Sequence, residues 1–492
     1  MKRKLVYICM FCLTFSCLIF PGCTVGPDYS RPQTPADTPE GFYNAGAHEE
    51  QVDDFTPVDR WWESFGDPIT AEMVGEALEN NYDLKAAAAR VLQSQAMLAE
   101  TRGLQWPDVS YNLNRDRSKR SFNFGGLGGG GRFTVMSTTW SHDLTASYIL
   151  DLFGKLKRSE QAAWADMLAA ETNEQVLINS IIASVVNSRI NIAIIQRRLA
   201  IARANTASRQ KTLEIVERRY EQGLVGPVDI RLARENLAAS KALEPSIELS
   251  LITARHALDV LLARRPGSSE DLPGTLSDLP ELKKVPVGLP ASLLDRRPDV
   301  KAAEFTLMAA NERIGVSIAQ LFPDLALTGS FGYSGDTIEE IFKYDYTEMY
   351  AAIFGLVQPI FKGGQIKAQI DAAKARYEEQ AANYAGIVLN AIREVEDALI
   401  TEQMLQAQLE QSQIRLTEAK AAESLSRQRY QSGVEGILAV LASERLSRMA
   451  EEELTILKGQ IWTSRVNLYL ALGGDWNQQE NEIMVVGKDD GK

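Results

Sequence analysis

An internal repeat is the feature that most constrains the fold of this 492-residue chain. The segment from Asn80 reads Asn-Asn-Tyr-Asp-Leu-Lys-Ala-Ala, and the segment from Arg296 reads Arg-Arg-Pro-Asp-Val-Lys-Ala-Ala. In each copy a helical pattern follows, and a Pro-Asp pair comes 24 residues after the aspartate, at Pro107 and at Pro323. Because the spacing is kept, we expect the two halves to share one order of structural elements.

Behind each Pro-Asp pair the hydrophobic pattern changes from a helical period to a period of two, which is typical of a strand. Apolar residues alternate with polar ones from Val109 to Asn114 and from Leu325 to Tyr333. A second strand is expected in each half, from Trp140 to Leu150 and, with weaker alternation, from Met349 to Val357. The sequence therefore predicts four strands per chain.

Two very long helical tracts follow the strands, at roughly Lys155–Tyr220 and Gln365–Tyr430. Apolar residues in the second tract recur at spacings of three and four, the pattern of a coiled-coil seam. These residues are Ile366, Ile370, Ala373, Tyr377, Ala381, Tyr384, Ile387, Ala391, Val395 and Leu399. At 1.5 Å per residue, about 65 residues form a rod of roughly 100 Å, which is longer than a compact globule needs.

Each long tract ends in a Tyr-x-x-Gly turn, at Gly223 in the first half and at Gly433 in the second. Helical patterns then resume to about Ala263 and Leu472. Glycine at a helix end supplies the positive φ that closes the last turn, so these glycines could be simple helix stops. Each half is thus predicted to run helix, two strands, long helix, turn, helix.

The N-terminus has the pattern of a secretory signal peptide over residues 1–22. Lys2, Arg3 and Lys4 precede an apolar run to Phe20, and Cys23 follows. The run is shorter than the roughly 20 apolar residues that a membrane-spanning helix needs. All four cysteines lie within the first 23 residues, so cleavage before Cys23 leaves one thiol and no intrachain disulfide.

The sequence around Cys23 resembles a lipoprotein processing site, in which the cysteine is acylated and becomes the first mature residue. Phe20 and Pro21 depart from the aliphatic and small residues that are usual there. Two acyl chains give stable membrane anchoring, whereas one gives only marginal binding. Thr24, in place of aspartate, resembles lipoproteins that are sent to the outer membrane. The alternative is cleavage with a free N-terminal thiol, a reactive group in an oxidising compartment.

Charge and histidine content argue against several other classes of protein. Without its signal peptide the chain has 49 basic and 65 acidic residues, a formal charge of −16, which makes nucleic acid an unsuitable partner. The three histidines, His48, His142 and His256, show no i, i+4 pair, and no His/Cys cluster exists in the sequence. We therefore expect no metal site and no cofactor.

Two glycine-containing motifs also fail the tests for catalytic or phosphate-binding loops. The run Gly125–Gly131 is not followed by Gly-Lys-Ser/Thr and opens no helix, so it is interpreted as a hairpin tip. The segment Gly332–Gly335 lacks the Gly-x-Ser-x-Gly spacing of a nucleophile elbow and lies within a predicted strand. We expect no enzymatic activity.

Four strands cannot close a barrel in a membrane. Open strand edges in lipid would leave backbone groups unpaired at a cost of several kcal/mol each. Three copies of the chain would supply twelve strands, enough for a barrel around an aqueous lumen, and the helical rods would extend that lumen. The pattern therefore favours a homotrimer in contact with outer-membrane lipid.

Several motifs together resemble the TolC-like outer-membrane efflux proteins, specifically the NodT-type lipoproteins, over nearly the whole mature chain. They are the mature start Cys23–Pro32, the Trp61-Trp62 pair before Phe65–Pro68, and Leu289-Pro290 leading to Leu294–Val300. The resemblance implies a mainly α fold with a β-barrel part: a trimeric twelve-stranded barrel continued by a coiled-coil α-helical periplasmic barrel. It also implies a passive exit duct of a tripartite efflux system, docked to a periplasmic adaptor (membrane fusion) protein and an inner-membrane pump.

The expected organisation has five parts. They are a signal peptide at 1–22, a lipid-anchored extended segment at 23–60, a first efflux repeat at 61–280, a second at 281–475 and a C-terminal tail at 476–492.

The resemblance also implies a gate, because the two Tyr-x-x-Gly turns of each chain form the periplasmic tip in this family. Tyr430 matches the family's gate tyrosine, and Asp229 matches the aspartate that restrains the inner helix pair, so a phenol–carboxylate hydrogen bond is expected. Ala439 and Ala442 stand where relatives often carry aperture aspartates. Glu435 is the acid that remains. It either lines the constriction or is a solvated charge on the outside of the loop.

Two alternatives to a small-molecule efflux duct remain at this point. A type I secretion exit for unfolded polypeptide would have the same architecture, since a passive lumen has no substrate pocket. A coiled-coil adhesin or spacer without a pore would not require matched strand pairs in both halves, so the repeat favours a duct.

Overall fold

The computed structural model describes most of the two repeats. The described residues are 24–34, 42–44, 60–124, 131–268, 272, 295–343 and 348–474. The signal peptide at 1–22, Cys23, the glycines at 125–130 and the tail at 476–492 lie outside the described residues.

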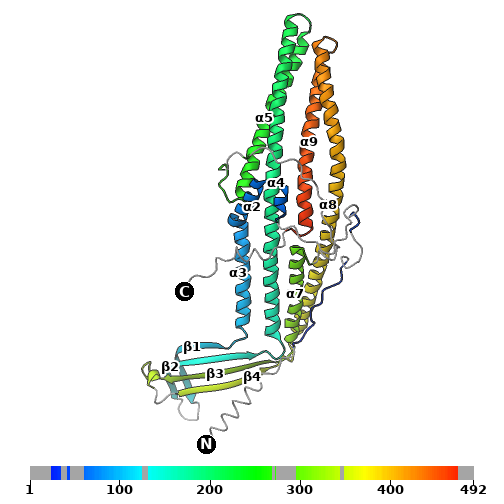
Figure 1. The fold of residues 1–492 in the computed structure, drawn as a ribbon. Coiled ribbons are helices and arrows are strands. Elements are labelled where there is room, and N and C mark those ends of the chain that lie inside the picture. Colours follow the sequence, from blue (N-terminus) through cyan, green and yellow to red (C-terminus); the bar gives the residue numbers. More distant parts are fainter. Residues whose placement is uncertain are drawn as a thin grey trace. The chain divides into compact units, whose positions relative to one another are not determined.

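Both halves of the chain repeat one order of elements, as the sequence predicts (Figure 1). The first half contains the 3-10 helix η3 (Trp61–Phe65), α2 (Pro68–Asn80), α3 (Tyr82–Gly103), β1 (Asp108–Phe124), β2 (Gly131–Leu150), α4 (Lys155–Glu221) and α5 (Pro227–Leu261). The second half contains α7 (Pro298–Ala319), β3 (Asp324–Gly335), the 3-10 helix η4 (Glu340–Phe342), β4 (Glu348–Val357), α8 (Gln365–Gln431) and α9 (Ile437–Ala471). The prediction of a mainly α chain with two strands per half is confirmed.

The chain forms two compact units, each built from both repeats. One unit comprises the described residues within 1–32, 91–169 and 303–383, and holds the strands with the adjoining helix ends. The other comprises the described residues within 33–90, 170–302 and 384–492, and holds the remaining helices with both tip turns.

The four strands form one antiparallel sheet in the order β1-β2-β3-β4. One face of the sheet is apolar, since the register places Tyr111, Leu144, Phe331 and Tyr350 in one row across all four strands. The next row begins Asn112, Asp143, and the Asn112 amide donates to the Asp143 carboxylate at 3.1 Å. One face thus suits lipid and the other suits water. β1 and β4 are the two edges.

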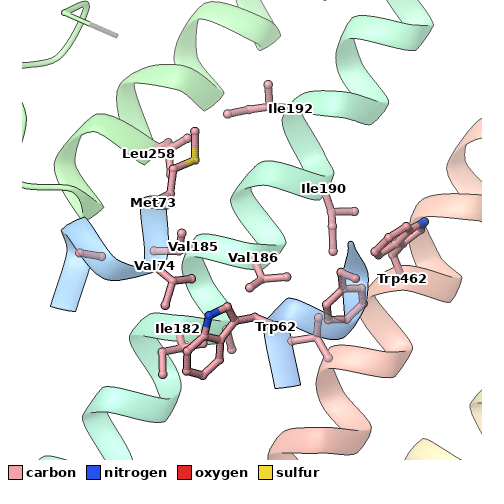
Figure 2. Close-up of a cluster of buried hydrophobic side chains, with 14 of the residues drawn as sticks. Trp62, Met73, Val74, Ile182, Val185, Val186, Ile190, Ile192, Leu258 and Trp462 are labelled. Carbon is pink, nitrogen blue, oxygen red and sulfur yellow. The ribbon is translucent and has the colours of Figure 1, made fainter. Parts of the chain in front are cut away.

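A hydrophobic core joins the helices of the second unit around α4. The Trp61 ring stacks on Tyr469 at 5.4 Å between ring centroids, and Phe65 stacks on Trp462 at 4.8 Å. Figure 2 shows side chains from the middle of α4 in one buried cluster with Trp462 and with Met73 and Val74 of α2. The α4 side chains include Ile182, Val185, Val186 and Ile190. α4 contains one window apolar enough to span a membrane by composition, but 61% of that window is buried, so packing explains its apolar character.

The N-terminal segment after residue 23 packs tightly within the first unit. The amide of Val25 donates to the carbonyl of Phe153 at 3.2 Å. Gly26 has φ 103°, and a Cβ atom there would lie 2.6 Å from the Cα of Gly315. The Arg158 guanidinium, which is 4% exposed, contacts the Asp28 carboxylate at 2.9 Å. The segment is therefore a fixed part of the fold.

Candidate functional site

Both tip turns have the geometry that the Tyr-x-x-Gly pattern predicts. Gly223 and Gly433 have φ of 69° and 79°, the left-handed region that favours glycine. Their amides donate to the carbonyls of Tyr220 at 2.9 Å and Tyr430 at 3.0 Å. α5 and α9 begin a few residues later, so the chain reverses direction after each long helix within one short loop (Figure 1).

The two tip tyrosines have different environments despite the repeat. Tyr220 is 43% exposed, whereas Tyr430 is 2% exposed. Tyr430 packs in a small core that all four tip helices contribute to. The buried members of this tip core are Leu213, Val216, Ala233, Leu237, Tyr430, Ile437, Val440 and Leu441. Tyr430 thus joins the two helical hairpins of one chain.

The hydroxyl of Tyr430 is buried and makes no hydrogen bond to any residue that the structure describes. Burial raises the pKa of this phenol, the Asp229 carboxylate raises it further, and the Arg219 guanidinium opposes both effects. Asp229 is therefore near enough to act electrostatically, but the expected phenol–carboxylate hydrogen bond does not form within one chain. The raised pKa keeps the phenol protonated at neutral pH, so it remains a hydrogen-bond donor.

Arg219 is the tip residue that sequence reasoning missed. Its guanidinium carbon lies 4.7 Å from the centroid of the Tyr430 ring. Its Nη1 donates to the carbonyl of Tyr430 and, at 3.4 Å, to that of Gln431. A cation at a helix C-terminus accepts no hydrogen bond but donates to the free carbonyls there, and it interacts favourably with the negative end of the helix dipole. Arg219 therefore caps α8 from the neighbouring hairpin.

Glu435 has a partner in its own hairpin, because its Oε2 lies 3.0 Å from Nε of Arg429. Both side chains are partly exposed, at 30% and 52%. The first repeat carries Val225 at the position equivalent to Glu435, and Val225 packs against the tip core. The equivalent arginines thus differ: Arg429 pairs locally with an acid, whereas Arg219 reaches the other hairpin.

A buried polar network lies beside the tip core. Glu444, 3% exposed, accepts hydrogen bonds from Thr212 Oγ1 at 2.7 Å and from Arg427 at 3.0 Å. Arg427 also donates to Ser208 Oγ at 2.7 Å, so the network connects α4, α8 and α9. A paired buried carboxylate specifies one packing of these helices, because breaking the pair would leave an uncompensated charge.

Comparison with known proteins identifies the family. The family model described as outer membrane efflux protein matches residues 73–264 and 289–474. The chain belongs to this family. The pyoverdine export outer membrane protein OpmQ of Pseudomonas putida is 30% identical over 447 residues, which cover 89% of this chain and 92% of the relative. The cation efflux system protein CusC of Escherichia coli is 29% identical over 476 residues, covering 95% and 98%.

Solved structures agree with this assignment. The outer-membrane channel OprN has a TM-score of 0.82 at 29% identity, with 92% of this chain and all of that chain covered. A CusC structure has a TM-score of 0.80 at 29% identity, with the same coverage. As an outer membrane efflux protein, the chain is an exit duct that lies in the outer membrane and extends into the periplasm.

The tip residues are therefore candidate gate residues of an efflux duct. Among the residues that the structure describes, no group of three His, Cys, Asp or Glu side chains could hold a metal ion.

Proposed function

We propose that three copies of this chain close one barrel by pairing edge strand β1 of each copy with β4 of the next. The supporting observation is a four-stranded antiparallel sheet with two edges and one apolar face. A sheet edge left open in lipid costs several kcal/mol per unpaired group, so the strands must be shared between copies. Twelve strands leave room for an aqueous lumen.

Outside the barrel, the long helices continue the duct into the periplasm. α4 and α8 each have 67 residues, which correspond to roughly 100 Å of helix. We propose that residues 61–280 and 281–475 are the two efflux repeats, that residues 1–22 are removed, and that acylated Cys23 anchors the mature chain. The tightly packed segment from Val25 to Asp28 supports an anchor held close to the strand–helix junction.

The duct conducts small molecules passively, in complex with a periplasmic adaptor protein and an inner-membrane pump, and it is not an enzyme. Relatives named for pyoverdine export, toluene efflux and cation efflux support small solutes as cargo. The three relatives are named for different cargo. Isolation of the chain with a pump of the type that secretes unfolded polypeptide would overturn the small-molecule assignment.

The tip closes the duct at its periplasmic end. The contact of Arg219 with Tyr430, together with the nearby Asp229 carboxylate, holds the two hairpins of one chain together. Asp229 and Tyr430 complete their hydrogen bond in the closed trimer, and Glu435 contributes charge at the aperture.

Conductance of the purified protein in a planar bilayer tests this function. We expect ion channels from a species of three chains, which crosslinking in native membranes also captures. A conducting monomer or dimer would contradict strand sharing, and a trimer without conductance would contradict the duct.

A further inference from the structure

The hairpin of β1 and β2 continues well past the rest of the sheet. Pairing of β2 with β3 stops at Trp140↔Gly335, whereas β1 and β2 remain paired from Arg115↔Trp140 to Phe124↔Gly131. The helices join these two strands at their other ends, at Asp108 and Leu150. We call residues 115–124 of β1 and 131–139 of β2 the hairpin extension. Since the helices extend into the periplasm, the hairpin extension faces the cell exterior.

The hairpin extension is strongly basic in an acidic protein. Its basic side chains are all exposed, and Asp116 is the acid among its described residues. The basic residues are Arg115, Arg117, Lys119, Arg120 and Arg132. The whole chain, by contrast, has a formal charge of −13. A local excess of positive charge of this kind attracts an anionic partner.

Most of this positive charge lies on one face of the hairpin extension. Side chains alternate along a strand, so Arg115, Arg117 and Lys119 share the face of Tyr111 and Leu113. Those two residues belong to the apolar, lipid-facing side of the sheet, which we call the apolar band. The three basic side chains continue the apolar band toward the cell exterior.

Arg132 completes the basic face from the second strand. It shares a face of β2 with Met136, which is four positions away and pairs with Lys119. Arg120 and Asp116 project from the opposite face. The basic face therefore comprises Arg115, Arg117, Lys119 and Arg132.

An aromatic side chain marks the boundary between the apolar band and the basic face. The guanidinium carbon of Arg115 lies 5.1 Å from the centroid of the Trp140 ring. Tryptophan is enriched where the hydrocarbon of a membrane meets its headgroups. Arg117, Lys119 and Arg132 therefore lie at headgroup level in the outer leaflet.

Acidic side chains at the same end of the sheet lie on a different segment. Asp336, Glu339 and Glu340 belong to the connection between β3 and β4, where the Glu340 carboxylate accepts a hydrogen bond from the Asp336 amide at 2.9 Å. Arg117, Lys119 and Arg132 form no ion pair with any residue that the structure describes. The cations of the basic face are available to an external anion.

We propose that the basic face of the hairpin extension binds the phosphate groups of lipid A, the phosphorylated glycolipid of the outer leaflet. Acyl chains of the lipid contact the apolar band, while its phosphates accept hydrogen bonds from the cations one level further out. Arginine suits this role because its planar guanidinium binds phosphate through two parallel hydrogen bonds. The proposal rests on the outer-membrane location of the barrel and adds a specific lipid to it.

Binding of bisphosphorylated lipid A to the purified full-length trimer, followed by native mass spectrometry, tests the proposal. Arg117→Gln and Arg120→Gln form a matched pair, because both remove one exposed arginine from β1 but from opposite faces. We expect Arg117→Gln to weaken binding about fivefold, the effect of about one cation at a lipid surface, and Arg120→Gln to change it less than twofold. The triple variant Arg117→Gln/Lys119→Gln/Arg132→Gln is expected to lose about a hundredfold.

Two lipid controls define the ligand. Lipid A without phosphates should bind the unaltered protein about as weakly as bisphosphorylated lipid A binds the triple variant. Phosphatidylglycerol, which carries one phosphate on a different headgroup, should bind more weakly than lipid A. Equal binding of the two lipids would reduce the basic face to a general anion-binding surface and overturn the assignment to lipid A.

Equal losses from Arg117→Gln and Arg120→Gln would also overturn the proposal, because they would show an effect of total charge and not of one face. Conductance of the same preparations separates this inference from the proposed function. If the unaltered trimer conducts but lipid A binding does not differ between the matched variants, only the lipid site is wrong. Should the triple variant fail to assemble, the matched single variants still decide the outcome.

Discussion

Arg219 of the first repeat donates a hydrogen bond to the main-chain carbonyl of Tyr430 in the second repeat, and its guanidinium lies over the ring of the same tyrosine. One side chain thus donates hydrogen bonds to carbonyls at the C-terminus of α8 and covers an aromatic ring of the tip core. This contact joins the two hairpins of a chain at the tip, which is the proposed gate of the duct.

Replacement of Arg219 with methionine keeps much of the side-chain length but removes the charge and the donors. A hydrogen bond from a charged group contributes about 1.5–3 kcal/mol, so each of three tips would lose about that much. We expect larger single-channel conductance and more frequent opening in planar bilayers. Arg429→Met is the matched control, because this equivalent arginine pairs within its own hairpin. Equal effects of the two substitutions would refute a specific role for Arg219.

The pairing of Glu435 with Arg429 gives a second prediction, for ion selectivity. If three Glu435 carboxylates face the aperture, Glu435→Gln should weaken cation selectivity, as measured by reversal potentials across a salt gradient. Arg429 lies 3.0 Å from the carboxylate and offsets its charge, so Arg429→Gln should instead strengthen cation selectivity. Unchanged reversal potentials in both variants would place the pair outside the constriction.

Close backbone packing gives a third prediction, for the N-terminal segment. A methyl group at Gly26 would lie 2.6 Å from the Cα of Gly315, and the φ of 103° is strained for any other residue. Gly26→Ala should therefore destabilise the packing of this segment by about 1–3 kcal/mol. Limited proteolysis should then cut near the N-terminus sooner than in the unaltered protein. Gly75→Ala is the control, since Gly75 lies in α2 with open space around it. Equal resistance of Gly26→Ala and Gly75→Ala to proteolysis would contradict the tight packing of the N-terminal segment.

Acylation gives a fourth prediction. Cys23→Ser should abolish incorporation of labelled fatty acid, because no other cysteine remains in the mature chain. The barrel provides a second attachment to the membrane, so the same variant, exported by another signal peptide, should keep some membrane association. Equal labelling of Cys23→Ser and the unaltered protein would exclude Cys23 as the acylated residue.

Periodicity made the fold of each repeat predictable. The long helices were expected at Lys155–Tyr220 and Gln365–Tyr430, and α4 and α8 extend one residue further. Helical and strand periods are local properties, so a single sequence reveals them. The strand signal weakens where both faces of a hairpin are exposed, which explains why the continuation of β1 to Phe124 was not predicted.

The tip chemistry was less predictable, because it depends on contacts between residues far apart in sequence. The duplicated Arg-Tyr pair at Arg219 and Arg429 was visible, but nothing local distinguishes an arginine that crosses to the other hairpin from one that stays. The repeats also differ at a nearby loop position, with Val225 in one and Glu435 in the other. A local acid holds Arg429, whereas the apolar Val225 leaves Arg219 free to cap α8.

The buried hydroxyl of Tyr430 gives the last prediction. Tyr430 is 2% exposed, and within one chain its hydroxyl has no hydrogen-bond partner among the described residues. A buried hydroxyl without a partner costs about 1–3 kcal/mol, so a partner in the closed trimer would stabilise that state. Asp229 is the candidate, since its carboxylate already acts on the pKa of Tyr430. We therefore expect Tyr430→Phe combined with Asp229→Ala to raise conductance and to let large antibiotics enter from outside.

Tyr220→Phe is the matched control for this prediction, because Tyr220 occupies the equivalent position in the first repeat but is 43% exposed. It should leave conductance unchanged. The single variant Tyr430→Phe distinguishes two states of the hydroxyl. If Asp229 accepts its proton in the closed trimer, Tyr430→Phe alone should open the duct, because a charge-assisted hydrogen bond is lost in each copy. If the hydroxyl stays without a partner, removing it should instead stabilise the closed tip, and conductance should fall or stay constant. That second result would remove Asp229 from the gate and leave Arg219 as the contact that holds the tip closed.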